Sequence, residues 1–410
     1  MLLVRTVATA NVIEKWLGKV LAETKKDPFR LFFPFGWLLG LIGIVPWIPF
    51  AWTDDATYPG GFHAVLMSRG FMPSFILGFL MTAVPRFTGT STARGWEVGV
   101  GLASILACFV AALLGELSYA RALTLFQIAL LAIFIAVRFP ERNVNPPGAF
   151  LFVAVGLILG FAGSLLELLG SLEQVEIPAS FVLFGKLTSF YGMVLALILG
   201  VGSRLFPGIL GWTEIVHAQR EQYEKPPSFV QAVPSDLFLG GILLVLSFLV
   251  ESLLEERSGR ALRAVLVLYV AVRYWRVHRK PKRISWMNWA LLAAAWSIVL
   301  GEWLSVLFPE WGLDGKHLVF VGGFSLLSLL VAARVTLAHG EGLTLESKRW
   351  PYVPVVLFIL LASVSRFGAH WTPNSYFPHL AYAAILWGLG AMAWGAYFLP
   401  RLWRGLFRKN

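Results

Sequence analysis

Long apolar runs alternate with short polar segments along almost the whole chain. A helix needs about 20 apolar residues to cross the hydrocarbon core of a bilayer. Twelve runs have about this length and predict membrane-spanning helices at 31–50, 62–84, 97–115, 119–138, 148–170, 181–204, 235–252, 258–275, 286–307, 317–337, 350–366 and 376–399. The eighth run is the weakest, because arginines lie at both of its ends. The pattern therefore predicts an all-α polytopic membrane protein.

The two ends of the chain differ from its centre. Residues 1–28 lack a long apolar core, but they place apolar side chains at helical spacing opposite a row of lysines. This pattern is typical of an amphipathic helix on the cytoplasmic membrane surface, and the alternative is a solvated tail. We expect residues 29–400 to form a single transmembrane domain, followed by a basic cytoplasmic tail at 401–410.

The charged residues indicate how the spans are oriented. Basic residues gather in alternate loops, as in "RYWRVHRKPKR", and acidic residues gather in the others, as in "WTDDATYPGG". Because basic loops face the cytoplasm, both termini are expected there. The chain is 57% hydrophobic and only 14% charged, against about 25% charged in a soluble domain. Its net charge of +11 is therefore explained by the orientation of the spans and by contact with the lipid headgroups of the bilayer rather than by nucleic-acid binding.

Two spans resemble each other closely. The segments "GKLTSFYGMVLALILGVGSR" (185–204) and "GKHLVFVGGFSLLSLLVAAR" (315–334) are 130 residues apart, a distance of four spans. The segment 62–87 has a looser version of the same outline. We interpret spans 2, 6 and 10 as equivalent parts of a pseudo-threefold repeat of four-helix units, surrounding one site. Chance similarity among apolar helices is the alternative.

Polar residues inside the spans are candidate functional residues, because an ionisable group in lipid is destabilising unless it is paired or hydrated. The single cysteine, Cys108, excludes a cysteine-based metal cluster. His63 and His317 begin spans 2 and 10 at the outer side, and neutral imidazole suits iron and copper. We predict them as metal ligands, with Met67 as a soft alternative. A histidine hydrogen-bonded to a loop carbonyl is the competing interpretation.

Basic residues lie at both ends of the same spans. Arg69 is too deep to reach the headgroups, so it is expected to pair with Glu167, Glu302 or a bound anion. Lys186 is expected to join it in stabilising negative charge on a bound ligand. At the inner ends, three arginines could hold haem propionates or anchor the spans to headgroups, and these are Arg86, Arg204 and Arg334.

One more histidine lies at the inner end of span 10. His339 is about 33 Å along the helix from His317, at 1.5 Å per residue. A single metal ion cannot bind both side chains. His339 is therefore predicted as a ligand of a separate metal site, with an ordinary interfacial histidine as the alternative.

These residues fall in segments that resemble a known family. The segments "DPFRLFFPFGWLLGLIGIVPW", "HAVLMSRGFMPSFILGFLMTAVPRFTG", "GVGSRLFPGILG" and "KHLVFVGGFSLLSLLVAARVTLAHG" are similar, in order, to those of the NnrS family. The resemblance implies twelve helices in the bacterial inner membrane, bound haem and copper, and a role in nitric oxide response and protection from nitrosative stress during denitrification. It also matches His63, His317, Arg334 and His339 to the polar motif positions of the family.

The chain departs from the family pattern at one informative place. Many members have His-Ala-His-Glu-Met where this chain has "HAVLM", so Val65 and Leu66 replace a second ligand and a carboxylate. Copper binding is therefore less well supported than haem binding. The leading hypothesis is a haem protein that binds, senses or removes nitric oxide or another small gas, and whether it is an enzyme stays open. The alternatives are a secondary transporter with buried charges and a scaffold for assembling a respiratory complex.

Overall fold

The computed structural model of the chain describes residues 22–53, 57–172, 174–212, 214, 228–340 and 342–407. These residues form helices and no strand, which confirms the predicted all-α class. Most of the predicted amphipathic segment, residues 1–21, and the last part of the tail, residues 408–410, lie outside the described residues.

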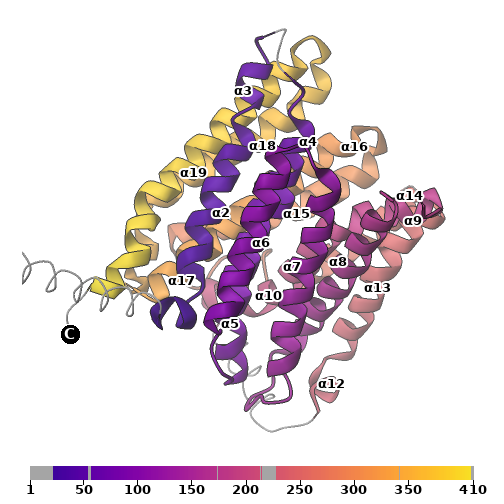
Figure 1. Cartoon of the computed structure of the whole chain (residues 1–410). Helices are drawn as coiled ribbons and strands as arrows, with labels where there is room; N and C mark the ends of the chain where they lie inside the picture. The colour runs from indigo at the N-terminus through magenta and orange to yellow at the C-terminus, as the bar shows by residue number, and fades with distance from the viewer. Residues whose placement is uncertain are drawn as a thin grey trace, which may run out of the picture.

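Long helices run up and down the bundle (Figure 1). In chain order they are α2 (Phe29–Ile44), α5 (Met72–Thr88), α6 (Gly95–Leu113), α7 (Leu117–Arg138), α8 (Leu151–Leu169), α10 (Met193–Leu210), α13 (Ser235–Leu253), α14 (Glu256–Arg273), α15 (Trp286–Leu307), α17 (Leu326–Ala338), α18 (Arg349–Gly368) and α19 (Tyr376–Phe407). Shorter helices lie between them and include α3 (Trp47–Phe50), α4 (Gly60–Val65), α9 (Ala179–Leu187), α12 (Phe229–Ala232) and α16 (Gly312–His317).

Eleven helical segments of the described chain are long and apolar enough to cross a membrane, one fewer than the twelve predicted. The exception is α14, the predicted eighth span, whose 18 residues include one glutamate and four arginines. This helix packs against both α13 and α15. Arg260 and Arg263 are buried there, so the protein and not the lipid surrounds the charges that weakened the prediction.

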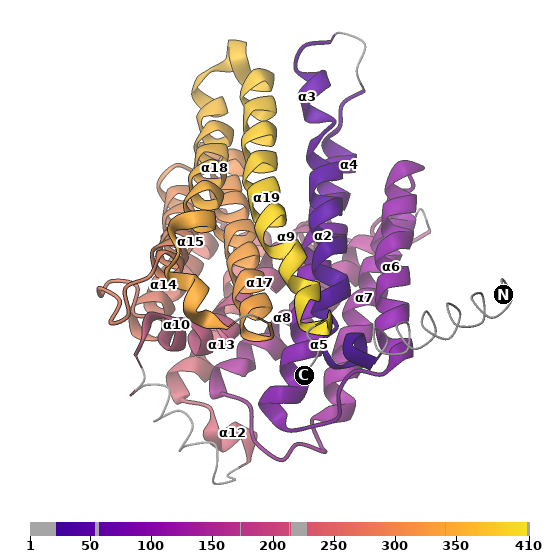
Figure 2. The same cartoon turned by 90° about the vertical axis from the view of Figure 1, so that its left-hand side faces the viewer.

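The start of α2 and the end of α19 lie at the same end of the bundle, as Figure 2 shows. The side chain of Arg30 donates hydrogen bonds to the backbone carbonyls of Leu402 and His339. Nearby, Arg86 forms an ion pair with Asp27 at 2.6 Å. We call this the His339 end and the opposite end, which contains α4 and α16, the His63 end.

Three spans contain a π-helical segment, and they are the ones predicted to be equivalent. The segments are η1 (Leu66–Phe71), η3 (Thr188–Gly192) and η5 (Leu318–Ser325). Each packs against the long helix that precedes it, which is α2, α8 or α15. A glycine of that helix allows the close approach, because a Cβ added at Gly43, Gly163 or Gly301 would come within 3.0 Å of the π segment or its side chains. This shared contact supports the pseudo-threefold repeat.

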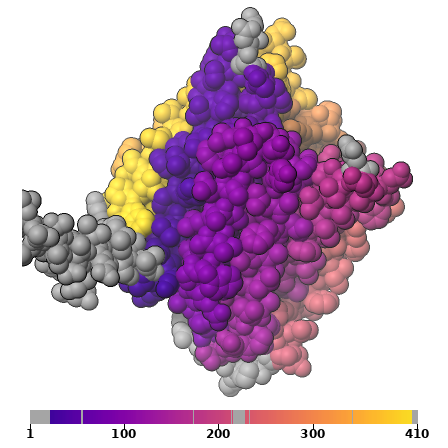
Figure 3. Space-filling model, viewed as in Figure 1, coloured from indigo at the N-terminus to yellow at the C-terminus, as the bar shows by residue number. Residues whose placement is uncertain are grey.

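The remaining helices of each repeat connect it to the next repeat. They form the antiparallel pairs α6–α7, α13–α14 and α18–α19, and the second helix of each pair contacts the first helix of another repeat: α7 with α8, α14 with α15, and α19 with α2. Exposed apolar side chains cover the outer faces, such as those of α6 and α7 at the front of Figure 3. A lipid-facing surface is expected to be apolar in this way.

Candidate functional site

Two histidines stand just before π segments at the His63 end. His63 lies in α4, three residues before η1, and His317 ends α16 directly before η5. Nδ1 of His63 contacts the carbonyl oxygen of Gly43 at 3.0 Å, and Nδ1 of His317 contacts that of Leu313 at 2.8 Å. Because a carbonyl only accepts, each Nδ1 carries the hydrogen and donates it. Each Nε2 therefore keeps its lone pair, which is the arrangement found in metal-ligating histidines.

The structure brings these two side chains, which we call the imidazole pair, into one region. The two rings lie near enough to Arg366 for its charge to act on both, and near enough to each other for a charge on His63 to act on His317. The ring of His63 packs edge-on against Trp47 at 5.8 Å between centroids, and that of His317 against Phe320 at 5.7 Å. Neither Nε2 has a hydrogen-bond partner in the part of the chain that the structure describes. The predicted alternative, a hydrogen bond to a backbone carbonyl, is also present, and it uses only Nδ1.

Met67 belongs to the same surroundings. It lies one turn after His63 on η1, and its sulfur would be 3.5 Å from a Cβ added at Gly43. Gly43 thus accepts the hydrogen bond from His63 and also borders the methionine. The structure places the predicted thioether ligand on the α2 side of the imidazole pair.

Arg366 is a candidate functional residue that the sequence analysis missed. It is buried near the end of α18 and pairs with Asp314, three residues before His317. His370 and Tyr376 also contact the Asp314 carboxylate, at 3.3 Å and 3.4 Å. One signal was available: an arginine at the end of a span that should carry few basic residues departs from the positive-inside rule.

Arg69 pairs with Glu167 at 2.9 Å, which confirms one of its three predicted partners. The two side chains come from η1 and α8 and are 14% and 13% exposed. Nη1 of Arg69 has no hydrogen-bond partner among the described residues. The pair therefore joins the first two repeats and leaves one N–H group of Arg69 uncommitted.

Glu302, the other proposed partner of Arg69, belongs to a different cluster. It accepts hydrogen bonds from Tyr191 and from Nε of Arg263, the latter at 3.2 Å. Arg263 also pairs with Glu251 at 2.6 Å, and Lys316 approaches that carboxylate at 3.7 Å. We call the whole group the charge network, and its members are Tyr191, Glu251, Arg260, Arg263, Glu302 and Lys316.

Lys186 does not reach these groups. It is exposed on α9, whereas its neighbours Gly185 and Leu187 are buried. Gly185 faces Gly163 of α8, which turns the following lysine toward the outside. This exposure gives no support to the prediction that Lys186 stabilises a ligand inside the bundle. Lys316, at the matching place 130 residues later, points inward to Glu251.

The basic residues of the His339 end are largely engaged within the chain. Arg86 pairs with Asp27, and Arg334 pairs with Glu346. Arg204 lies six residues before the end of α10 and is partly buried. Arg86 and Arg334 are thus already paired with carboxylates of the protein. This pairing disfavours the prediction that they hold a haem propionate.

His339 lies at this same end, far from the imidazole pair. Its Nδ1 donates to the carbonyl of Val335 at 2.7 Å, and its ring packs on Phe29 at 5.1 Å. Burial lowers the pKa of His339 below its usual range. Among the described residues there is no group of three or more histidine, cysteine, aspartate or glutamate side chains placed to hold a metal ion. The remaining donor set is the imidazole pair, and two axial ligands suffice for haem iron.

A family model described as NnrS protein matches residues 25–405, nearly the whole chain. The chain belongs to the NnrS family. The resemblance found in the sequence is confirmed, and membership supports a membrane protein of the nitric oxide response in general. NnrS proteins are known to bind haem. A comparison with curated proteins finds no match.

Proposed function

We propose that this NnrS protein holds haem at the His63 end, between spans 2 and 10, and uses it to bind nitric oxide. The observation that carries the proposal is the state of the imidazole pair. Each ring donates its Nδ1 hydrogen to a backbone carbonyl and keeps Nε2 unpartnered, and each stands just before a π segment at the same end of the bundle. Such a hydrogen bond orients a ligating imidazole and makes Nε2 more basic.

The surrounding residues suit this role. His63 and His317 would hold the haem, and its iron would supply a site for a diatomic gas in exchange for one of the two imidazoles. Arg366 lies near both imidazoles, but its charge is already paired with Asp314, so it supports a propionate contact no better than Arg86 and Arg334 do. Trp47 and Phe320 pack edge-on against the two rings. Met67 offers a soft alternative to one imidazole.

Copper is the less supported cofactor. Val65 and Leu66, which replace potential ligands, are 5% and 0% exposed and pack in a small apolar cluster with Ala111, Ala112 and Ala120. Their side chains contribute packing between α4, α6 and α7. We therefore infer a haem site at which neither of these positions contributes a copper ligand.

We further propose that the protein lies in the bacterial inner membrane with its His339 end in the cytoplasm. The arginines at the ends of spans 2, 6 and 10 lie toward that end, and these are Arg86, Arg204 and Arg334. The opposite end carries acidic residues, including Glu167, Glu302 and Asp314. The positive-inside rule then favours cytoplasmic termini.

The transporter hypothesis receives less support. Its argument was the buried charges, but Arg69 and Glu167 neutralise each other, and both carboxylates of the charge network are paired with arginines. The cavity at the centre of the bundle is lined by apolar side chains and one serine. A hydrophilic substrate would find no charged group there, in contrast to the midplane sites of secondary transporters.

The test is the visible absorption spectrum of the protein purified from haem-replete cells. We expect a Soret band in the wild type and its loss in His63→Ala and in His317→Ala. The matched control is His379→Ala, because this histidine lies in α19 at the same end and its side chain contacts Ser365 and Tyr382. A colourless wild type, or a Soret band unchanged in both single variants, contradicts the proposal.

A further inference from the structure

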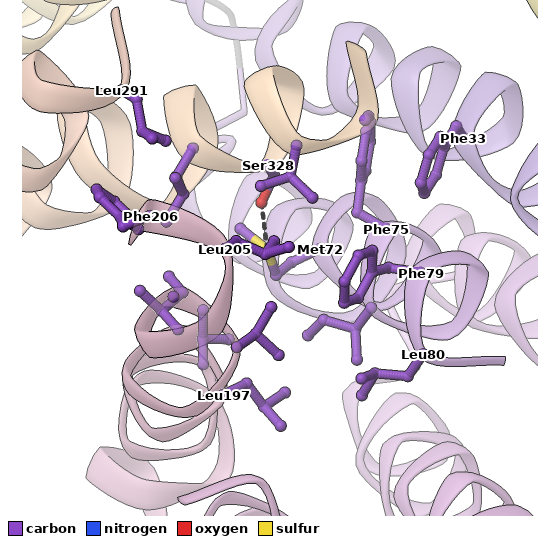
Figure 4. Close-up of a pocket in the computed structure, with 18 of the residues that line it drawn as sticks. Phe33, Met72, Phe75, Phe79, Leu80, Leu197, Leu205, Phe206, Leu291 and Ser328 are labelled. Carbon is purple, nitrogen blue, oxygen red and sulfur yellow. Dashed lines mark hydrogen bonds between the residues drawn. The ribbon is translucent and has the colours of Figure 1, made fainter. Parts of the chain in front are cut away.

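A cavity lies on the axis of the bundle, on the His339 side of the π segments. Its walls come mainly from α5, α10 and α17, the continuations of spans 2, 6 and 10 (Figure 4). Met72 directly follows η1, and Leu327 stands two residues after η5, so the cavity begins where the π segments end. His63 lies nine residues before Met72, about 14 Å along a helix. The cavity is therefore distinct from the region of the imidazole pair.

The wall of the cavity is almost entirely apolar. Representative side chains are Phe75, Phe79, Leu197, Val201, Leu327 and Val331. Ser328 is the only lining residue with a polar side chain, and its hydroxyl donates to the sulfur of Met72 at 3.4 Å. A buried water molecule needs two to four polar partners. This wall does not offer them, so the cavity is expected to stay dry.

The size of the cavity limits what it can hold. Its volume is about 90 Å³, less than the about 150 Å³ of an engineered apolar cavity that binds benzene or xenon. Haem and quinones are too large for this space, and a quinone would also need hydrogen-bond donors for its carbonyl groups. A small apolar gas molecule fits this volume, and the apolar wall suits it.

We propose that this central cavity is a binding site for small apolar gas molecules. Each of the three equivalent spans contributes a stripe of apolar side chains at helical spacing, and the three stripes meet around the axis without filling it. Gases such as nitric oxide dissolve readily in hydrocarbon, so molecules that reach the protein through the bilayer can collect there. The site needs no haem, and it stands or falls independently of the imidazole pair.

The experiment is diffraction from crystals of the haem-free protein under xenon pressure. The wild type should show a xenon peak between α5, α10 and α17. Val201→Phe places a ring into the cavity and should remove the peak. The matched control Val110→Phe makes the same change on the exposed face of α6, where Val110 is 45% exposed, and should keep it.

Three results would overturn the proposal. The first is a wild-type crystal with no xenon peak in the cavity. The second is an unpressurised crystal in which an acyl or detergent chain fills the same space. The third is a folded Val201→Phe protein, shown by its elution as a single species, that keeps the peak. If Val201→Phe does not fold, Ile198→Phe takes its place, because Ile198 lines the same wall of the cavity.

Discussion

The His63 end contains two polar groups of side chains, and they differ in whether their members meet an opposite charge within the protein. In the charge network, both carboxylates of Glu251 and Glu302 meet positive groups, and Arg263 spans the two. In the imidazole pair, only one nitrogen of each ring is engaged. The two groups meet near η5, because Lys316 belongs to the first and the adjacent His317 to the second.

This difference separates polar side chains that stabilise the fold from polar side chains that can bind a ligand. A buried charge that meets an opposite charge contributes little free energy that a ligand could use, because part of its desolvation is already compensated inside the protein. A half-buried imidazole with a free lone pair retains an acceptor that a ligand can use. Burial and charge alone would have marked the charge network as the site. What separates the two groups is that the carboxylates of the charge network meet opposite charges within the protein, whereas each Nε2 of the imidazole pair has no protein partner among the described residues.

The largest effect is expected from breaking the charge network. Arg263→Leu leaves Glu251 and Glu302 without their shared partner, and removing one member of a buried ion pair destabilises by about 3–5 kcal/mol. Unfolding in mixed micelles measures the free energy of unfolding, and Arg273→Leu, an exposed arginine of the same helix, is the control. A loss of haem at unchanged stability would reverse the assignment and make the network the ligand site.

Breaking the ion pair between Arg69 and Glu167 should destabilise the protein less, because both side chains are partly exposed. Arg69→Met leaves a carboxylate with a poor partner, and we expect a loss of about 1–3 kcal/mol. The double variant Arg69→Met with Glu167→Met should recover most of it, since it removes both charges. A double-mutant cycle on unfolding free energies measures the coupling. No recovery in the double variant would show that the pair does not act as a unit.

The imidazole pair should contribute little to the stability of the haem-free protein. In His63→Gln and His317→Gln the amide retains a hydrogen-bond donor, so the change in unfolding free energy should stay within about 1.5 kcal/mol. The same variants should lose the Soret band. A destabilisation as large as that of Arg263→Leu would mean that the histidines are structural, and the comparison above would fail.

The smallest effect concerns His339, a histidine with the same carbonyl contact but no second imidazole beside it. Burial lowers its pKa, so the unfolded state binds the proton more readily below about pH 6.5. Stability should therefore be complete above that pH and decrease as the pH falls toward the lowered pKa. His339→Gln should reduce the difference in melting temperature between pH 7.5 and pH 5.5. The control His278→Gln, at an exposed loop residue, should keep the wild-type difference.

The span pattern was predictable because it rests on local composition. The equivalence of spans 2, 6 and 10 was also visible in the matched Gly-Lys and arginine positions, and the π segments now give it a structural basis. Arg69 needed a partner at its own depth, so Glu167 could be named among three candidates. These successes share one property: each follows from hydropathy or from depth along a helix.

The failures concern the rotation of helices about their axes. Lys186 and Lys316 stand at matching sequence positions, yet one is exposed and the other faces Glu251. The arginines of α14 made it look too polar for a span, but neighbouring helices supply their partners. Arg366 was missed because its partner Asp314 lies on another helix. Hydropathy does not reveal which residue a side chain will meet across a helix interface.

The sequence by itself therefore determined the class of protein, the order and depth of the spans, the family, and the two histidines worth testing. Only the tertiary structure decided which polar side chains neutralise one another, which imidazole nitrogens stay free, and where the central cavity lies. The physical reason is that a span's length and apolarity follow from transfer of each residue into lipid, whereas pairing and cavities depend on how several helices pack together.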